Sequence, residues 1–275
     1  MDTVNICIVT PNLNMGLYLE ETILSVLSNM DINDEYYIVD GGSIDNSLEI
    51  IKKYQSKITG WISEPDFSYA DAISKGFKMT NLSHLCWVGS GDLLLSGSIK
   101  FAKEIFNSNN VDFIYGDDIC INENGNLIQI SNGNVYDIAN FMYYGKWSPL
   151  QDACFWTRDI YERVGGLNIN LKYAADYDLF LKITNNCNSI YIPYTFSAFR
   201  KHDGQTSIKY KKLYRLEQNM AKKSLKSFKY NVFKHAFFYI LARVRARLFV
   251  KKNTSSNIIG KKYDMIKSNF TRNYL

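Results

Sequence analysis

The chain has 275 residues, a length that fits one large domain or two small ones. Hydrophobic residues make up 46% and charged residues 21%, which is ordinary for a globular protein and excludes wholesale disorder. No apolar run reaches the roughly 18 residues that a membrane-spanning helix needs, and no basic stretch among the first residues predicts a signal peptide. We therefore expect a globular protein of the cytoplasm.

The charge is distributed unevenly along the chain. Residues 1–198 hold 12 Lys/Arg and 24 Asp/Glu, a net −12, whereas residues 199–275 hold 20 and 3, a net +17. A basic tail of this kind favours an anionic partner. The stretch 232–252 alternates apolar clusters with Lys and Arg, which predicts an amphipathic helix on an anionic membrane surface; a helix packed on the domain with a solvated basic face is the alternative. No recognised nucleic-acid motif accompanies the charge, so we do not expect nucleic-acid binding.

Five cysteines occur at positions that form no CxxC pair: Cys7, Cys86, Cys120, Cys154 and Cys187. The odd count and the wide spacing argue against a zinc or redox site. Most of them lie in apolar runs, so we expect reduced, buried side chains.

The first hundred residues alternate short apolar runs with helical spacing. We predict strands at 4–9, 36–39, 59–63 and 85–88, and helices at 16–28, 45–54, 69–79 and 96–106. This alternation implies crossover connections and an α/β fold, with a mainly parallel central sheet flanked by helices. Ligands of such sheets bind at the carboxyl ends of the strands.

After residue 106 the pattern changes. We predict strands at 111–115 and 127–130 around the turn signal Asn124-Gly125, helices at 158–164 and 176–183, and closing strands at 189–192 and 196–200. Residues 136–149 are irregular and aromatic, and from 210 the chain is helical and basic. We predict one domain over 1–207 and a basic helical C-terminal extension over 208–275.

Polar residues, most of them with a carboxylate nearby, follow the four strands of the first half. They are Thr10-Pro11-Asn12, Asp40, Glu64-Pro65-Asp66 and Ser90-Gly91-Asp92. Carboxylates can hold a base N–H, ribose hydroxyls or a divalent cation that bridges a diphosphate, and Mg²⁺ and Mn²⁺ suit such oxygen ligands. No GxGxxG follows the first strand and no GxxxxGK[ST] occurs, so a Rossmann dehydrogenase and a P-loop ATPase lack their main support.

Six segments, in order, carry a resemblance to a known family. They are IVTPNLNMGLYLEETILSVLSN, YYIVDGGSIDNSLEII, ISEPDFSYADAISKGF, CWVGSGDLLLSGSI, QDACFWTRDIYERVGGLNINLKYAADYDLFLKI and FRKHDGQTS. Over these segments, about residues 4–207, the chain resembles the inverting glycosyltransferases of family 2, which have the GT-A fold. The resemblance implies transfer of a sugar from a nucleotide-sugar donor, with a UDP-sugar expected, to a hydroxyl of a glycan or lipid-linked acceptor. Its usual setting is bacterial surface polysaccharide biosynthesis (O-antigen, capsule or exopolysaccharide), at the inner face of the cell membrane.

The resemblance also implies which residues bind the donor. The set is Thr10, Pro11, Asn12, Asp40, Glu64, Asp71, Lys75, Ser90 and Gly91. Thr10, Pro11 and Asn12 would line the base pocket, Asp40 would bind the base or ribose, and Lys75 would lie near phosphate. The alternative for Asp40 is a solvated residue of a Gly-Gly turn. The alternative for Asp71 and Lys75 is a surface i,i+4 ion pair.

Metal binding is implied by the segment Ser90-Gly91-Asp92, where the family usually carries two acids. Gly91 replaces one of them, so Asp92 alone is retained. His202 matches a family position that can complete the metal or diphosphate site. We expect Mg²⁺ or Mn²⁺ at Asp92 and His202, with the substitution at Gly91 putting metal affinity in question. The adjacent acids Asp117 and Asp118 are expected to be solvated at a strand end.

The resemblance places the catalytic base at Asp176, which would take the proton of the acceptor hydroxyl. Ala175 replaces the family's usual Glu, and Asp178 would give structural support. The alternative for Asp176 is a helix N-cap. Trp147 could stack on a sugar face or be a core residue, with Gln151 beside the acceptor region. Arg200 and Lys201 could offset the charge of the diphosphate.

A second function stays open. The substitutions at Gly91 and Ala175 are also compatible with a non-catalytic nucleotide-sugar-binding or scaffold protein of the same fold. The retained set of Asp92, Asp176 and His202 favours the enzyme.

Overall fold

The computed structural model describes residues 4–131, 149–202, 205 and 209–225. Over these ranges the strands are β1 (Ile6–Asn12), β2 (Glu35–Asp40), β3 (Gly60–Ser63), β4 (His84–Trp87), β5 (Leu93–Leu94), β6 (Phe113–Ile121), β7 (Leu127–Ser131), β8 (Cys154–Thr157) and β9 (Ser189–Arg200). The helices are α1 (Gly16–Leu27), α2 (Ser47–Tyr54), α3 (Tyr69–Lys78), α4 (Ser98–Ser108), α6 (Arg158–Arg163), α7 (Ala175–Asn186) and α9 (Lys211–Ser224), with a 3-10 turn η1 (Gln151–Ala153). Most of the predicted elements are confirmed to within a few residues.

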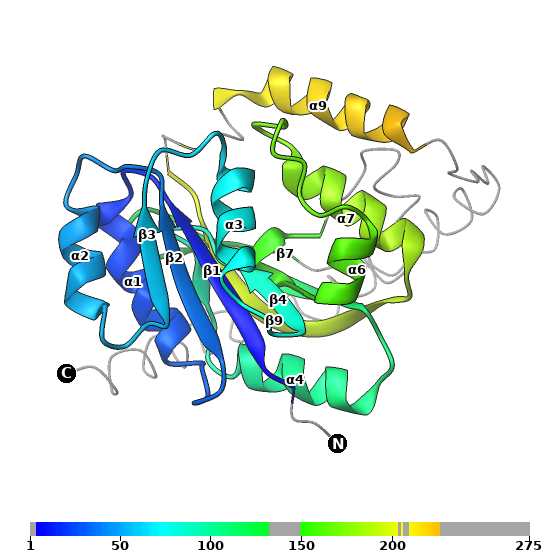
Figure 1. Ribbon diagram of the computed structural model, residues 1–275, viewed down its shortest axis with the longest axis horizontal. Helices are drawn as coiled ribbons and strands as arrows, with labels where there is room; N and C mark the ends of the chain where they lie inside the picture. Colours follow the sequence, from blue (N-terminus) through cyan, green and yellow to red (C-terminus); the bar gives the residue numbers. More distant parts are fainter. Residues whose placement is uncertain (1–3, 132–148, 203–204, 206–208, 226–275) are drawn as a thin grey trace.

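The strands of the described ranges form one sheet (Figure 1). β3, β2, β1 and β4 run parallel to one another in that order. β8 lies antiparallel between β4 and β6, β9 runs parallel to β6, and β5 and β7 pair antiparallel with β9 and β6. The first half is therefore the parallel sheet that the alternation predicts, while the second half is mixed.

Two strands of the second half differ from the prediction. β8 was not predicted, because its four residues lie between a 3-10 turn and a helix and show no period. It becomes a strand by pairing with β4 and β6. β9 joins the two predicted closing strands, and its register with β6 shifts around Gly116 and Asp117. This irregularity accommodates Pro193, which has no N–H for a sheet ladder.

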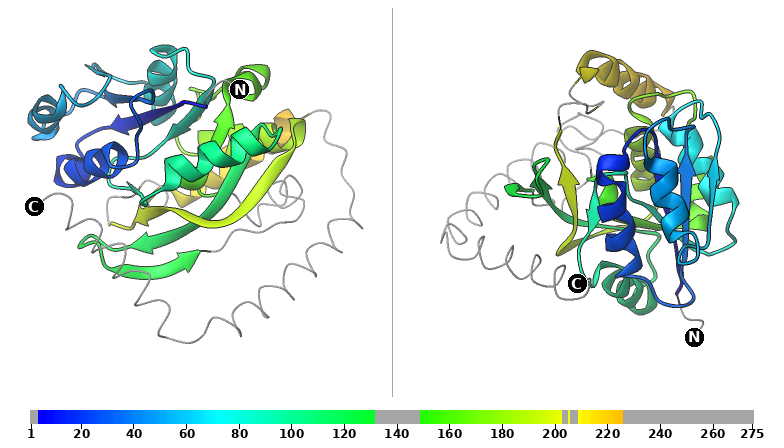
Figure 2. Two further views of the ribbon diagram at one scale, coloured as in Figure 1. Left: turned by 90° about the horizontal axis from the view of Figure 1, so that it is seen from below. Right: turned by 90° about the vertical axis from the view of Figure 1, so that its left-hand side faces the viewer.

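Helices cover both faces of the sheet, as two further views show (Figure 2). Ile6 and Ile8 of β1 belong to a buried cluster with residues of α1, α2 and α4. Cys7 and Val9, on the opposite face, belong to a second cluster with residues of α3, α6 and α7. Strands that are buried on both faces are apolar at successive positions, which explains the short runs in the sequence.

One glycine sets how closely α3 approaches the sheet. A Cβ at Gly76 would lie 2.5 Å from Cγ1 of Val9 in β1, a distance that real side chains do not tolerate. Glycine therefore allows α3 to lie directly on β1. This packing places the first turn of α3 beside the carboxyl ends of β1, β2 and β3.

The part of the predicted extension that the structure describes lies against the domain. α9 crosses over α7 (Figure 1), Ala221 is buried in the second cluster, and Tyr214 packs against it. The stretch 232–252 lies outside the described residues, and the boundary at 207 stays a prediction. Among the described helices, none is both long and apolar enough to cross a bilayer.

Candidate active site

Asp40, at the end of β2, is the centre of a hydrogen-bond network. Its Oδ1 accepts from Nδ2 of Asn12 at 2.7 Å and from the hydroxyl of Ser43, and its Oδ2 accepts from the hydroxyl of Ser63 at 2.7 Å and from the backbone N–H of Ser43 at 2.9 Å. Burial by itself would raise the pKa of Asp40, but these hydrogen bonds outweigh it and the pKa is lowered. Asp40 is fully buried. It is therefore an ionised carboxylate that holds three strand ends together, rather than a solvated turn residue.

The end of β1 is tied to its neighbours in the same way. The hydroxyl of Thr10 is hydrogen-bonded to that of Tyr36 at 2.9 Å, and the hydroxyl of Ser90 donates to the carbonyl oxygen of Pro11 at 3.0 Å. Thr10 and Asn12 are buried. The structure thus brings the predicted base-pocket residues to one edge of the sheet, next to Asp40.

Lys75 lies among three carboxylates. Its Nζ is 2.8 Å from Oε1 of Glu64, 2.8 Å from Oδ1 of Asp66 and 3.4 Å from Oδ2 of Asp71. The hydrogen bonds with Asp66 and Glu64 are the main causes that raise the pKa of Lys75. The i,i+4 pair with Asp71 exists, but the two shorter contacts reach back to the loop after β3. Lys75 therefore clamps this loop onto α3.

Asp71 shapes the start of α3. The hydroxyl of Ser68, the N-cap residue, accepts from the backbone N–H of Asp71 at 3.3 Å, and Oδ2 of Asp71 accepts from the backbone N–H of Phe67 at 3.1 Å. Such reciprocal capping satisfies N–H groups that a helix start otherwise leaves unpaired.

The loop after β4 depends on glycine and on a buried arginine. Gly91 has φ +105°, a conformation that favours glycine, and its N–H donates to the hydroxyl of Thr22 at 2.9 Å. Nε of Arg200 donates to the carbonyl oxygen of Gly91 at 2.8 Å, and its guanidinium also pairs with Glu21. Arg200 is only 1% exposed. Its charge is used to secure this loop, and its contact with a diphosphate stays a prediction.

Asp92 has a neighbour that the sequence did not single out. Asp152, on η1, is buried like Asp92, and each of the two carboxyl groups affects the pKa of the other. They meet over Gly89: its N–H points at Oδ1 of Asp152 at 3.5 Å, and a Cβ there would lie 2.8 Å from Oδ2 of Asp92. Burial, followed by the proximity of Asp152, raises the pKa of Asp92, and burial raises that of Asp152.

Two buried acids of β6 correct a prediction. Asp117 and Asp118 were expected to be solvated, yet both are buried in the middle of β6. Oδ1 of Asp117 accepts from the hydroxyl of Tyr191 at 2.7 Å, and Oδ1 of Asp118 accepts from Ser197 and from the N–H of Phe199, each at 3.2 Å. The strand continues six residues beyond the predicted end, so the two acids lie inside the sheet rather than after it.

The described residues allow a test of the implied metal. Among them, no three His, Cys, Asp or Glu side chains converge so that they could hold a cation unaided. Mg²⁺, however, is commonly bound by one or two carboxylates together with substrate phosphates and water. Asp92 and Asp152 fit that arrangement, because Oδ2 of Asp152 is buried without a hydrogen-bond partner. The centre of the His202 ring lies 5.9 Å from that of Tyr18, and its part in metal binding stays a prediction.

Asp176 is the second residue of α7. The hydroxyl of Tyr69, from α3, makes two hydrogen bonds with this residue. It donates to Oδ1 of Asp176 at 3.2 Å and accepts from the backbone N–H of Asp176 at 3.0 Å. The N-cap residue of α7 is Ala174, so the N-cap alternative for Asp176 is wrong. Burial is the main cause that raises the pKa of Asp176 to about 6. This side chain is a carboxylate with the basicity that proton abstraction near neutral pH requires.

Of the other predicted residues, the structure describes Asp178, Gln151 and Lys201. Asp178 is buried and its Oδ2 lies 2.6 Å from Nζ of Lys182, one turn along α7; its supporting role stays a prediction. Gln151 begins η1, next to Asp152, and Lys201 follows β9. Trp147 lies outside the described residues.

The fold and this site define a class of protein. A parallel α/β sheet that continues into a mixed half, with helices on both faces, is consistent with the GT-A fold of glycosyltransferases. The chain belongs to glycosyl transferase family 2, whose family model matches residues 7–165. The predicted fold class and family are therefore confirmed.

Relatives agree with this assignment. A PGL/p-HBAD biosynthesis glycosyltransferase of Mycobacterium bovis (strain BCG / Pasteur 1173P2) is 23% identical over 184 residues, which are 65% of this chain and 69% of that protein. S. aureus TarS 1-349 in complex with UDP-GlcNAc has a TM-score of 0.66 at 16% identity, covering 84% of this chain and 69% of that one. The chain spans 41% of the longer TarS structure.

A mannosyltransferase from Pyrobaculum calidifontis in complex with GDP-Man and Mn²⁺ has a TM-score of 0.58 at 12% identity, covering 94% of this chain and 79% of that one. At these identities the structural likeness establishes the shared fold.

Proposed function

We propose that this glycosyltransferase transfers a sugar from a UDP-sugar to a hydroxyl of a glycan acceptor, with inversion at the anomeric carbon. The observation that carries the proposal is Asp176: a carboxylate at the start of α7, fixed by Tyr69, with its pKa raised to about 6. A base with this pKa is mostly ionised at neutral pH and is still basic enough to accept a proton.

In this mechanism Asp176 takes the proton of the acceptor hydroxyl. The hydroxyl oxygen attacks the anomeric carbon from the side opposite the nucleoside diphosphate, which leaves with the bonding electrons. Attack from the opposite side inverts the configuration. Tyr69 keeps the carboxylate in place during the transfer, because its hydroxyl bonds both Oδ1 and the backbone N–H of the same residue.

The donor would bind at the ends of β1, β2 and β4. Thr10, Pro11 and Asn12 line this edge, and the network around Asp40 holds the loop of Gly41 and Gly42 where the base and ribose would lie. UDP is proposed as the nucleotide because TarS, a structural neighbour, is described in complex with UDP-GlcNAc. The clamp of Lys75 on Glu64 and Asp66 would keep the neighbouring loop in position.

A divalent cation, Mg²⁺ or Mn²⁺, would be held by Asp92 and Asp152, with His202 as the further predicted ligand. When bound, such a cation supplies positive charge against the diphosphate of the donor. The buried, unpartnered Oδ2 of Asp152 supports this assignment, and Asp152 would provide the second carboxylate that is absent at Gly91. The mannosyltransferase neighbour is described with Mn²⁺.

The setting is also proposed. A glycan or lipid-linked acceptor in bacterial surface polysaccharide biosynthesis would place the protein in the cytoplasm, at the inner face of the membrane. α9 supports this, because four basic side chains are exposed on it: Lys211, Lys212, Arg215 and Lys223. Their positive charge would be attracted to an anionic membrane surface. Full-length protein should sediment with vesicles that contain anionic lipid at low salt, and should not sediment with neutral vesicles.

Calorimetry with UDP, GDP and TDP, with and without Mn²⁺, tests the donor proposal. We expect binding of UDP that Mn²⁺ strengthens. Transfer is then tested with UDP-GlcNAc and other UDP-sugars by measuring UDP release, and NMR of the product shows whether an α-linked donor gives a β-linked sugar. Retention of configuration would contradict the inverting mechanism. Nucleotide binding without turnover for every donor and acceptor would favour the non-catalytic alternative, which the substitutions at Gly91 and Ala175 support.

A further inference from the structure

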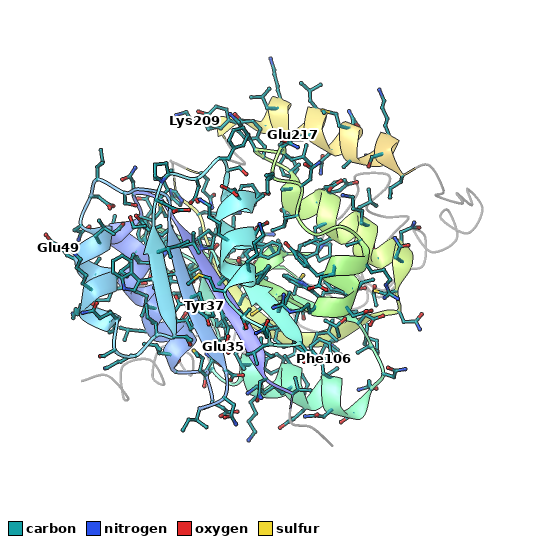
Figure 3. The ribbon with its side chains drawn as sticks, in the orientation of Figure 1. Glu35, Tyr37, Glu49, Phe106, Lys209 and Glu217 are labelled. Carbon is teal, nitrogen blue, oxygen red and sulfur yellow. The ribbon has the colours of Figure 1, made fainter. Side chains whose placement is uncertain are left out.

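A carboxylate from α9 reaches the segment that leads into α7. Oε1 of Glu217 accepts from the backbone N–H of Lys172 at 3.0 Å, and Oε2 accepts from the N–H groups of Tyr173 and Ala174, both at 2.8 Å. These three residues directly precede Ala175, where α7 begins. Figure 3 shows Glu217 where α9 passes over this segment.

The three bonds supply acceptors to three successive backbone N–H groups. Lys172, Tyr173 and Ala174 lie outside any helix or strand, so no backbone ladder supplies acceptors for their N–H groups. Ala174 is the N-cap residue of α7. Glu217, more than 40 residues later, binds the N–H groups at and before this position. Bonds from N–H groups to an ionised carboxylate are stronger than those to a neutral acceptor.

We propose that Glu217 is a positioning residue for Asp176, so that α9 is a working part of the catalytic domain rather than a separate extension. This rests on the proposed function of Asp176 as the base. We call the three bonds from Glu217 to residues 172–174 the tether. Asp176 lies two residues after Ala174, the last residue of this segment, and its contact with Tyr69 depends on where α7 begins. Shifts of about 1 Å in a catalytic group can cost up to about 100-fold in rate.

The placement of α9 makes the tether specific. The ring of Tyr210, just before α9, lies 5.0 Å from the ring of Tyr173, and Ala221, one turn beyond Glu217, is buried in the core cluster. Contacts on both sides of Glu217 therefore fix the position of α9 along the segment. A mobile helix would not hold a carboxylate on three successive N–H groups.

Glu217 also acts on Asp176 through its charge. Among the residues that the structure describes, the titratable groups that act on Asp176 are Tyr69 from α3, Asp152 from η1, Cys154 from β8, and Tyr214 and Glu217 from α9. After burial, which is the largest cause, the negative charge of Glu217 contributes to the raised pKa of Asp176. Removing that charge should lower the pKa of the base, which a purely structural tether would leave unchanged.

The test uses the full-length chain with Glu217→Gln, which keeps the shape and removes the charge. We expect kcat for sugar transfer to fall by about 10- to 100-fold with the KM for the UDP-sugar within about twofold of wild type. In a plot of kcat against pH, the fall on the acid side (the acid limb) should move to lower pH. Glu217→Asp, which keeps the charge, should hold that limb near its wild-type position. Glu104→Gln, the same change at an exposed residue of α4, is the matched control and should behave as wild type.

Hydrogen exchange provides a readout that needs no activity. In the wild-type protein the amides of residues 172–174 should be protected, and Glu217→Gln should make them exchange at least about 10-fold faster. Fast exchange in the wild type would overturn the tether, even if the variants failed to fold. If the amides of residues 172–174 exchange faster in the variant but kcat and its pH dependence stay as in the wild type, the positioning role is overturned. If the wild type transfers no sugar, the proposed function fails instead, and the ¹³C titration of Asp176 in wild type and variant decides whether Glu217 acts on it.

Discussion

The two halves of the sheet differ in how their functional residues are assembled. In the parallel half, β1 to β4, the candidate residues lie at or just after the ends of their strands. Asn12 bonds Asp40 and Ser90 bonds Pro11, because parallel strands end at one edge. In the mixed half, Asp152, Asp176 and Glu217 come from a 3-10 turn and from the start and the middle of two helices. The first half therefore builds a site by regular topology, and the second half builds one by long-range contacts. The difference teaches that the candidate residues at the strand ends can be predicted from strand order, whereas the groups around the proposed base cannot.

The largest effect is expected at the base itself, in the second half. Asp176→Asn removes the proton acceptor while the amide keeps the size of the side chain. We expect kcat to fall by about 100- to 10,000-fold, with UDP affinity unchanged because the donor edge belongs to the first half. UDP release and calorimetry measure the two quantities. Asp159→Asn, the same change at an exposed residue of α6, should retain wild-type activity. Loss of UDP affinity in Asp176→Asn would contradict the expectation that nucleotide binding depends only on the first half.

The pH dependence of the rate should follow the same residue. The pKa of Asp176 is raised to about 6, and only the ionised form accepts a proton. The kcat should therefore be constant above about pH 7 and fall about tenfold for each pH unit below the pKa. Steady-state kinetics from pH 4.5 to 8.5 measures this limb. A kcat that does not change across pH 6 would assign the proton transfer to another group.

In the first half, the expected effect is on stability as well as on binding. Asp40→Asn leaves a buried amide where two oxygens now accept from Asn12, Ser43 and Ser63. We expect the free energy of unfolding in urea to fall by about 2–3 kcal/mol and UDP binding to weaken with it. Asp31→Asn, at a mostly exposed side chain, should change the stability by less than about 0.5 kcal/mol. Unchanged stability in Asp40→Asn would mean that the network does not hold the three strand ends.

The smallest effect concerns the contact between the halves, where Asp152 of the second meets Asp92 of the first. If the two carboxylates share a cation, Asp152→Asn should reduce the strengthening of UDP binding by Mn²⁺ about tenfold and leave binding without Mn²⁺ unchanged. Calorimetry with UDP over a range of Mn²⁺ concentrations measures this. Asp178→Asn serves as the comparison, because that residue is buried but paired with Lys182. An unaltered Mn²⁺ dependence would remove Asp152 from the cation site.

Much of the fold could be predicted from the sequence. The alternation of short apolar runs with helical spacing predicted β1 to β4 with α1 to α3, because strands buried on both faces and amphipathic helices leave periodic patterns in a single chain. β8 could not be predicted, because its four residues become a strand only when β4 and β6 lie on either side. The burial of Asp117 and Asp118 was missed because the length of β6 depends on its pairing with β9.

The sequence by itself determined the family, the α/β class, the strand-end position of the candidate donor residues and the candidate base at Asp176. These follow from local patterns and from short segments in a fixed order. The tertiary structure alone decided that Asp152 lies against Asp92, that Arg200 secures the loop of Gly91, and that Glu217 binds the N–H groups before α7. The physical reason is the same in each case: these contacts join residues far apart in the sequence, and no local pattern records a neighbour that only folding brings near.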